Sequence, residues 1–281
     1  MNINIDEITF IIVTHQSEQV IKNCLNSLPK NSKKIIVENS QNLKLKKSLE
    51  HNYDNIEVVI SENLGMGGSN NIGIEKSKTK YAYVLNPDVR FKKDTIDVLL
   101  KYLKKIDDFA IATPLNSNKD YPNFKIEPKK QNFNYNDFIS VDTIDGFSML
   151  INKSKYQDNI YFDENFFLYL ENDDLCLRTK KKGEKIFVIT KALIDHSGGI
   201  GKTDKIEQLR NWHWMWSKFY FNKKHYGYLI ALKNISLNFI GAVIKYLIYL
   251  LIMKKNKRKV YEMRIKGIFN SIMGKKSWFR I

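Results

Sequence analysis

The 281-residue sequence predicts an α/β fold in which a mainly parallel sheet carries helices on both faces. Two observations lead to this prediction. Over the first 110 residues, short runs rich in β-branched residues alternate with segments whose apolar residues recur at helical spacing. Each run is followed at once by polar or glycine-containing residues, as expected where a strand ends in a loop. Such alternation favours a sheet whose binding sites lie at the carboxyl ends of its strands.

The expected elements can be placed in chain order. Strands are expected at residues 8–13, 34–37, 56–60, 81–85, 146–151 and 185–189, and helices at 17–28, 94–106 and 173–182. The first helix ends at Pro29 and the last at Gly183, two residues that typically stop helices. Residues 113–139 lose the regular pattern, and a stretch of that length inside a compact domain is typical of a functional loop or a mobile segment.

The composition changes in the C-terminal part, and the sequence predicts two domains. Residues 1–225 form the α/β domain, and residues 226–281 form basic and apolar C-terminal helices. The formal net charge is +16. Residues 254–281 hold ten Lys or Arg against one Glu, so this segment alone carries +9. A segment of this kind suggests nucleic acid, an anionic membrane surface or an acidic partner.

The C-terminal helices are expected to associate with a membrane. Residues 235–253 carry Lys245 as their only charge and are almost long enough to span a bilayer. A polar stripe follows one face of this helix, at Asn234, Asn238, Gly241 and Lys245, and a second apolar pattern continues among basic residues up to Phe279. These patterns favour amphipathic helices lying in the membrane interface over a span. A helix packed on the α/β domain is the remaining alternative for part of this region.

Two further features bear on the cellular compartment. Cys24 and Cys176 have no Cys-x-x-Cys spacing and are expected to be buried free thiols in a reducing compartment. The N-terminus lacks a basic segment followed by an apolar run, so no signal peptide is expected. Both features predict a cytoplasmic protein.

The glycine positions exclude several classes of nucleotide-binding protein. No glycine precedes Gly65, whereas a dinucleotide-binding fold needs glycines in the first turn between strand and helix. A sugar nucleotidyltransferase would need a glycine-rich loop at the same place. The segment GGIGKT at residues 198–203 ends like a phosphate-binding P-loop. However, His196 occupies the position of that motif's first glycine.

Candidate ligand-binding residues lie at strand ends. Asp88 follows the strand at residues 81–85, which Pro87 stops by removing a backbone donor. One carboxylate beside the amide oxygen of Asn86 suits Mg²⁺ or Mn²⁺ next to a diphosphate, although a plain turn gives the same pattern. The glycine-rich residues 62–73 open a helix and let backbone approach a ligand, or form a flexible turn.

Acidic residues cluster where the later helix begins. Glu171, Asp173 and Asp174 place three carboxylates within four residues. The helix dipole accounts for one or two acids in a first turn. The repulsion among three indicates a metal, another cation or a function. His196 follows the strand at residues 185–189, where a structural role is the alternative.

Taken in chain order, these segments resemble family 2 glycosyltransferases, which have the GT-A fold. The resemblance is closest to the bacterial rhamnosyltransferase-like enzymes that build surface polysaccharides. The matching segments, which span roughly residues 8–200, are IIVTHQSE, KKIIVENSQ, ENLGMGGSNNIGI, YVLNPDV, DGFSMLI, FDENFFLYLENDDLCLR and DHSGG.

The resemblance implies a nucleotide-sugar site built from several strand ends. Thr14 and Glu38 would hold the nucleoside, with Glu38 standing where the family usually has Asp. The turn containing Gly65 and Gly67, together with Asn70, would shape the nucleotide pocket.

The resemblance also implies a divalent metal, Mg²⁺ or Mn²⁺. The segment from Asn86 to Asp88 occupies the family's Asp-x-Asp position, with Asp88 as the metal ligand and Asn86 in place of the first Asp. His196 matches a late histidine of the family that approaches the metal or the diphosphate.

One departure concerns the catalytic base. The Asp of the family's Glu-Asp pair, usually taken as the base, is Asn172 here, and an amide cannot accept a proton at neutral pH. Glu171, Asp173 or Asp174 could take this role. We expect Glu171 or Asp173 ahead of Asp174, which could instead cap the helix or pair with Arg178.

The implied function is an inverting, metal-dependent glycosyl transfer. The donor would be a nucleoside diphosphate sugar, either dTDP-rhamnose or a UDP-sugar, and the acceptor a lipid-linked saccharide or oligosaccharide of a surface polysaccharide. The protein would bind peripherally at the cytoplasmic face of the inner membrane. A catalytically inactive carbohydrate-binding or scaffold protein is the alternative. Nucleic-acid binding is disfavoured, because the basic residues lie beside a long apolar run.

Overall fold

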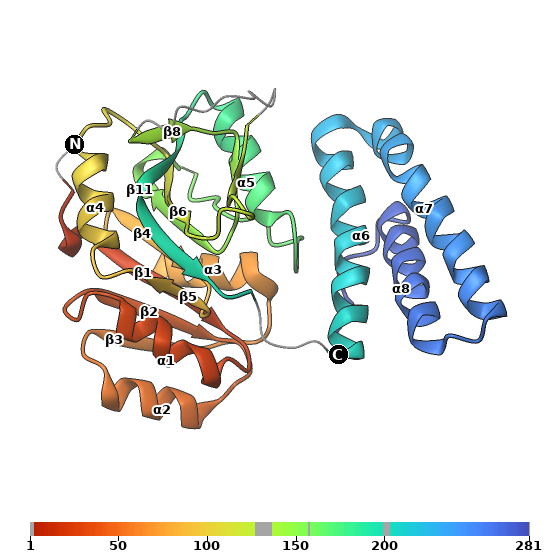
Figure 1. Ribbon diagram of the computed structural model, residues 1–281, viewed down its shortest axis with the longest axis horizontal. Coiled ribbons are helices and arrows are strands. Elements are labelled where there is room, and N and C mark those ends of the chain that lie inside the picture. The colour runs from red at the N-terminus through yellow and green to blue at the C-terminus, as the bar shows by residue number, and fades with distance from the viewer. Residues whose placement is uncertain (1–2, 127–136, 157, 199–202, 281) are drawn as a thin grey trace. The chain divides into compact units, whose positions relative to one another are not determined.

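The computed structural model describes residues 3–126, 137–156, 158–198 and 203–280. Two compact units make up the chain (Figure 1). The sheet unit contains Met1–Asp163 and Asn172–Gly199, and the helical unit contains Glu164–Glu171 and Ile200–Ile281. Helix α6 (Asp204–Tyr226) therefore groups with the C-terminal helices, whereas the sequence prediction extends the α/β domain to residue 225.

A nine-stranded mixed sheet forms the centre of the sheet unit, in the order β3–β2–β1–β4–β10–β6–β11–β5, with β8 paired to β11. The strands are β1 (Ile8–Thr14), β2 (Lys33–Glu38), β3 (Ile56–Ile60), β4 (Tyr81–Leu85), β5 (Val89–Phe91), β6 (Ile111–Asn116), β8 (Phe138–Ser140), β10 (Ser148–Asn152) and β11 (Ile186–His196). Strands β1 to β4 run parallel, and β10 runs antiparallel between β4 and β6. Strands β7 (Phe124–Lys125) and β9 (Thr143–Ile144) form a separate antiparallel pair.

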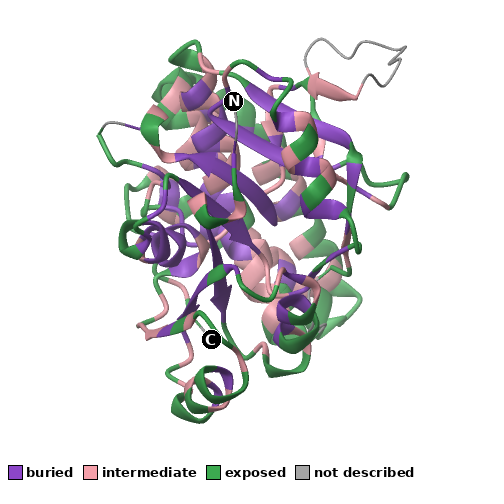
Figure 2. Cartoon of the chain, turned by 90° about the vertical axis from the view of Figure 1, so that its left-hand side faces the viewer, coloured by how far each residue is buried: buried purple, intermediate pink, exposed green. Residues whose placement is uncertain are grey.

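Helices cover both faces of this sheet, as the sequence predicts. Successive residues of a strand point to opposite faces. In β1, Phe10 and Ile12 pack with helices α1 (Glu18–Ser27), α2 (Leu43–Asn52) and α4 (Thr95–Leu103), whereas Ile11 packs with α3 (Gly65–Lys76) and α5 (Glu171–Lys181). The central strands β1, β4 and β10 are entirely buried between these layers (Figure 2).

Three long helices form the helical unit: α6, α7 (Tyr228–Leu251) and α8 (Lys255–Ile272). Met215, Phe219, Ile235 and Ile268 fill the core between them. At Gly267 an added Cβ would lie 2.3 Å from the Trp212 carbonyl oxygen, so only glycine allows α6 and α8 to approach this closely.

The helical unit also binds two further segments of the chain. From residues 164–171, Phe166 is fully buried with its ring 4.9 Å from that of Tyr220, and the Leu168 carbonyl accepts a hydrogen bond of 2.9 Å from Ser217. After α8, the chain returns to α6, where the His213 ring nitrogens lie 2.9 Å from the Ser277 hydroxyl and 2.8 Å from the Phe279 carbonyl.

The polar stripe expected along α7 contacts the neighbouring helices, although Asn234 and Lys245 also remain exposed. Asn234 donates to Asn222 and Asn238 accepts from Lys218, both at 2.7 Å and both to α6, while the Lys245 ammonium lies 5.5 Å from the ring of Tyr261 on α8. The exposed face is apolar instead and includes Leu229, Leu237, Ile240, Ile244, Leu247, Ile248 and Leu251. Among the described helices, α7 alone is long and apolar enough to cross a membrane, judged by length and composition.

Candidate active site

The first two strands end side by side on the residues predicted to hold a nucleoside. Thr14 and Glu38 are register partners at the ends of β1 and β2. The Thr14 hydroxyl donates a hydrogen bond of 2.6 Å to Glu38 Oε2, and the backbone N–H and the hydroxyl of Ser40 donate to Oε1. Thr14 and Glu38 are fully buried. Since a carboxylate offers about four acceptor positions, Glu38 is held in place and can still accept a hydrogen bond from a ligand.

The glycine-rich segment forms the first turns of α3 beside these strand ends. Gly65 has a φ of 81°, which favours glycine, and Gly67 is buried. Asn70 is 3% exposed, and its Oδ1 accepts no hydrogen bond from the described residues. Asn39 donates to Ser69 at 2.6 Å, but its own Oδ1 also lacks a donor there. Buried amide oxygens without a donor are uncommon, so both oxygens are suited to accept a hydrogen bond from a ligand.

Asp88 and His196 come together from different strands, as the sequence predicts. Asp88 lies between β4 and β5, and His196 ends β11, which pairs with β5. The distance from His196 Nε2 to Asp88 Oδ2 is 3.4 Å. The imidazole stacks on the ring of Phe147 at 4.0 Å, and the hydroxyl of Ser197 donates to the Asp88 carbonyl at 3.2 Å. Packing on both sides therefore fixes this pair.

The donors at this point fit a divalent cation. Two ligand atoms about 2.1 Å from one ion and at a right angle to each other are about 3 Å apart, close to the separation of Asp88 and His196. The buried Oδ1 of Asn86 accepts no hydrogen bond from any described residue. No described group of three or more His, Cys, Asp and Glu side chains could hold a metal. A bound ion would therefore keep positions for water and phosphate oxygens, as Mg²⁺ usually does.

Both cysteines are buried and free, as predicted. Burial, with a smaller effect from the charge of Asp88, raises the pKa of Cys24 to about 12. Burial also raises the pKa of Cys176 to about 12. Since the thiolate is the form that ligates metals and acts as a nucleophile, burial disfavours both roles for these cysteines at neutral pH.

The acids at the start of α5 have different surroundings. Asp174 is fully buried and forms an ion pair of 2.8 Å with Arg178, the alternative that the sequence leaves open for it. This pair serves the fold, because Arg178 also donates to the backbone carbonyls of Ile160 and Tyr161. Asp173 lies 3.4 Å from Lys125, and 18% of its side chain is exposed.

Glu171 and Asn172 mark a division within α5. Glu171 is the first residue of the helix and belongs to the helical unit, whereas Asn172 belongs to the sheet unit. The Asn172 amide donates a hydrogen bond of 2.8 Å to the carbonyl of Ile144. At Gly146 an added Cβ would lie 3.2 Å from the Cβ of Asn172. The segment at residues 144–146 therefore fits closely against Asn172.

Asp145, at the centre of that segment, was missed among the predicted site residues. Burial raises its pKa, against a hydrogen bond from Tyr121 and the charges of Lys125 and His196. The charge of Asp173 acts in the same direction as burial. The available signal was an acid directly before a glycine at the start of the strand expected at residues 146–151.

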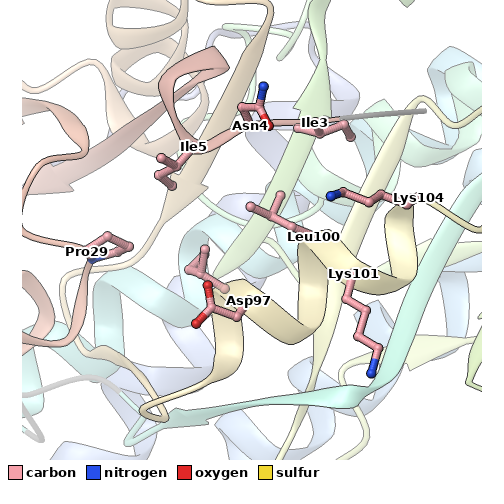
Figure 3. A pocket seen from close by; sticks show the side chains of 9 residues that line it. Ile3, Asn4, Ile5, Pro29, Asp97, Leu100, Lys101 and Lys104 are labelled. Atoms are coloured by element: carbon pink, nitrogen blue, oxygen red, sulfur yellow. The ribbon is translucent and has the colours of Figure 1, made fainter.

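A shallow pocket of about 400 Å³ lies apart from these residues (Figure 3). The residues that line it come from the N-terminal segment, Pro29 and the outer side of α4, and are Ile3, Asn4, Ile5, Pro29, Ile96, Asp97, Leu100, Lys101 and Lys104. None of the predicted site residues is among them.

Comparison with known proteins identifies the family. The model of the family described as "Glycosyl transferase family 2" matches residues 9–167, which are more than half of the chain. This range includes every strand end described above except that of β11. The chain belongs to glycosyl transferase family 2. Among its relatives, the low-salt glycan biosynthesis hexosyltransferase Agl10 of Haloferax volcanii is 26% identical over 201 residues, which are 65% of this chain and 64% of that protein. The rhamnosyltransferase WbbL of Escherichia coli strain K12 is 28% identical over 216 residues, 64% of this chain and 79% of that protein.

Solved structures agree on the fold. The mannosyltransferase PcManGT from Pyrobaculum calidifontis, in complex with GDP-Man and Mn²⁺, aligns with a TM-score of 0.57 at 10% identity and covers 96% of this chain and 88% of that protein. GalNAc-T7 with UDP, GalNAc and Mn²⁺ also has a TM-score of 0.57, at 13% identity over 78% of this chain and 50% of that protein. The GT-A fold expected for this family member is thereby confirmed.

Proposed function

We propose that this family 2 member transfers a hexosyl-type residue from a nucleoside diphosphate sugar to a saccharide hydroxyl, with inversion at the anomeric carbon. The observation that carries the proposal is the Asp88–His196 pair, 3.4 Å apart at the carboxyl end of β4 beside the unsatisfied oxygen of Asn86. The relatives' names, hexosyltransferase and rhamnosyltransferase, support a hexosyl or rhamnosyl group as the one transferred, and we expect dTDP-rhamnose or a UDP-sugar as the donor.

Different side chains bind the nucleoside and the diphosphate of the donor. Thr14, Glu38 and the first turns of α3 bind the nucleoside and hold its orientation. The diphosphate lies near Asp88 and His196, the residues that would hold Mg²⁺ or Mn²⁺. The bound ion would neutralise the negative charge that develops on the leaving diphosphate.

The acceptor reacts from the opposite side of the sugar. A carboxylate near the first turn of α5 accepts the proton of the attacking hydroxyl, which makes the oxygen a better nucleophile. A single displacement then inverts the anomeric carbon. Unlike a glycosidase, the site needs no second carboxylic acid to protonate the leaving group.

The helical unit is the part that we expect to meet a membrane. Its helix α7 bonds Asn234 and Asn238 to α6, and most of the large side chains that it exposes are leucine and isoleucine, which is unusual for a water-facing helix. Residues 254–281 add a charge of +9, which favours an anionic leaflet. We therefore propose peripheral attachment to the cytoplasmic face of the cell membrane, where a lipid-linked saccharide would be the acceptor.

Asn172 favours a second candidate function. Its amide is engaged with the carbonyl of Ile144, at the position where the family's base is expected. A protein that binds nucleotide sugar or saccharide without transferring it would need no base there. Binding without turnover would support this alternative, and turnover would exclude it.

Metal-dependent donor binding tests the proposal at the site itself. Isothermal titration of dTDP, UDP and GDP, each with Mn²⁺ and with excess chelator, should show one nucleotide bound tightly only when the metal is present. Asp88→Ala should lose the metal-dependent part of the affinity and keep its circular dichroism spectrum. Equal binding with Mn²⁺ and with chelator would contradict the metal site.

A further inference from the structure

The loop before β10 carries an acid that the proposed reaction has not yet used. We propose that Asp145 is the catalytic base that deprotonates the acceptor hydroxyl, in the role that Asn172 cannot perform. This inference rests on the proposed function and names the residue that completes it.

Asn172 is committed to holding this loop in place. Its Nδ2 donates to the Ile144 carbonyl at 2.8 Å, and Gly146 leaves room for its Cβ on the other side of Asp145. The loop is also held by the Asp145 backbone N–H, which donates to the Asn123 carbonyl at 3.0 Å. Asn172, which stands where the family's base is expected, therefore contacts the residues on both sides of Asp145. The carboxylate of Asp145 belongs to the loop that this position contacts.

The carboxyl group of Asp145 lies among the charged groups of the candidate site. It accepts a hydrogen bond from the Tyr121 hydroxyl, and it is within electrostatic range of Lys125 on β7, Asp173 on α5 and His196 on β11. Burial keeps its pKa above the ordinary range of an aspartate. A carboxylate that binds a proton more readily is a better general base at neutral pH.

Two other acids of the region, Asp173 and Asp174, have different roles in the fold. Asp174 has no exposed surface and pairs with Arg178, and Asp173 pairs with Lys125. Asp145 is paired with no Lys or Arg side chain within 4.0 Å in the described parts of the chain, and its hydrogen bond comes from the Tyr121 hydroxyl instead.

A neutral amide at position 172 allows the neighbouring Asp145 to ionise. An aspartate there would direct a negative oxygen at the Ile144 carbonyl and add a second charge next to Asp145. Like charges at that distance oppose each other's ionisation. The Asn172→Asp variant should therefore lose activity, whereas a protein that had merely lost its base would gain activity from the same change.

The proposed step is balanced within the site. The acceptor oxygen forms a bond to the anomeric carbon as the bond from that carbon to the diphosphate oxygen breaks. The diphosphate leaves with the bonding electron pair, and the acceptor proton moves to Asp145. The proton is released to water when the product leaves.

The experiment compares steady-state turnover and donor affinity in the parent and four variants, with nucleoside diphosphate release and isothermal titration as readouts. Asp145→Asn should reduce kcat at least ~10²-fold with donor affinity unchanged, and Asp145→Glu should retain part of the activity. Asp142→Asn is the matched control, because Asp142 lies three residues before Asp145 and pairs at 3.3 Å with Lys180 in the last turn of α5. Its turnover should equal that of the parent. The fourth variant is Asn172→Asp, with the loss predicted above.

The outcomes separate this inference from the proposed function. An active parent whose Asp145→Asn variant keeps more than a tenth of its turnover overturns the inference alone. An Asn172→Asp variant that exceeds the parent overturns it too, because position 172 would then act as the base. A parent that transfers no sugar from any donor overturns the proposed function itself, and the inference with it.

Discussion

At the scale of single residues, the proposed chemistry depends on side chains held at strand ends by neighbours that do not react. Ser197 and Phe147 fix Asp88 and His196, and Ser40 fixes Glu38. Each reactive group therefore has a defined position before any ligand arrives. Such positioning lowers the cost of ordering the site during the reaction.

The pair at the end of β4 gives a graded prediction. Asp88→Ala should reduce turnover at least ~10²-fold, because it removes the one negative ligand next to the diphosphate. His196→Ala should reduce it less, since an imidazole that ligates a metal ion adds no negative charge next to it. Initial rates at several Mn²⁺ concentrations measure both effects, and excess chelator should abolish turnover by the parent enzyme. Equal losses in the two variants would mean that the histidine contributes more than a ligand.

Most of these residues could be predicted from the sequence, because they directly follow apolar runs that form strands. Thr14, Glu38 and Asp88 lie at the ends of strands that the sequence predicts, whereas His196 ends β11, seven residues beyond the end of the strand expected at 185–189. Asp145 could not be identified in this way. Its importance comes from contacts across the fold, namely those of Asn172 with the carbonyl of Ile144 and with Gly146, and no local pattern encodes them.

At the scale of elements, two helix glycines provide a matched test of the packing in the helical unit. An added Cβ at Gly267 would lie 2.3 Å from the backbone of Trp212, whereas at Gly241 it would meet nothing within 4 Å. Gly267→Ala should destabilise the helical unit by about 1–3 kcal/mol. Gly241→Ala should be neutral or stabilising by up to about 1 kcal/mol, through helix propensity. Thermal unfolding followed by circular dichroism checks both, and equal effects would contradict the close crossing of α6 and α8.

The contact between α6 and the C-terminal segment should be sensitive to pH. Burial lowers the pKa of His213 to about 4, against a hydrogen bond to the Phe279 carbonyl and together with the charge of Arg280. In the unfolded chain this pKa is 6.5. The neutral form is thus favoured by folding, and its contribution is complete above pH 6.5 and is lost as the pH falls toward 4. A decrease from 6.5 to about 4 corresponds to about 3 kcal/mol.

Unfolding measured at pH 7 and pH 5 tests this dependence. The parent should lose stability over that interval, and a His213→Asn variant, which keeps polar atoms but does not titrate, should lose less. Identical losses in the two proteins would assign the pH dependence to other groups.

The elements themselves were predicted well where their patterns are local. The strands expected at residues 56–60 and 81–85 are β3 and β4, and the helix expected at 173–182 is α5, which starts two residues earlier. Helix α2 and strand β6 were not predicted, and neither were the short strands β5, β7, β8 and β9. The short strands have two or three residues each and so no period to detect, and they exist because a neighbouring strand pairs with them.

At the scale of the whole molecule, the sequence predicts that the C-terminal helices associate with a membrane, but it does not show which side of α7 contacts the neighbouring helices. The stripe containing Asn234 and Asn238 could be interpreted as a water-facing side. In the structure it bonds to α6, and the apolar side remains exposed. The sequence likewise could not show that α6 groups with α7 and α8, because its tryptophans suit either unit.

Flotation with vesicles tests the membrane proposal. Leu237 and Leu251 are each 81% exposed, so replacing both by Glu should leave the fold intact and remove two apolar contacts worth about 1.5–3 kcal/mol each. The parent should float with vesicles containing anionic lipid, less so at high salt, and the double variant should not. Leu43→Glu on α2, where Leu43 is 61% exposed, is the control and should float like the parent. A parent protein that does not float with such vesicles would contradict the proposal.

The central claim is that the strand ends around Asp88 form the donor site of a working glycosyltransferase. The most direct measurement is nucleoside diphosphate release from a panel of UDP-, dTDP- and GDP-sugars, with membrane extract as the source of acceptor. We predict that one donor is consumed, that the extract accelerates its consumption, and that sugar appears in a new glycan or glycolipid. The same panel with Asp88→Ala should show no acceptor-dependent release. Release from no donor, or acceptor-dependent release that survives Asp88→Ala, would contradict the account.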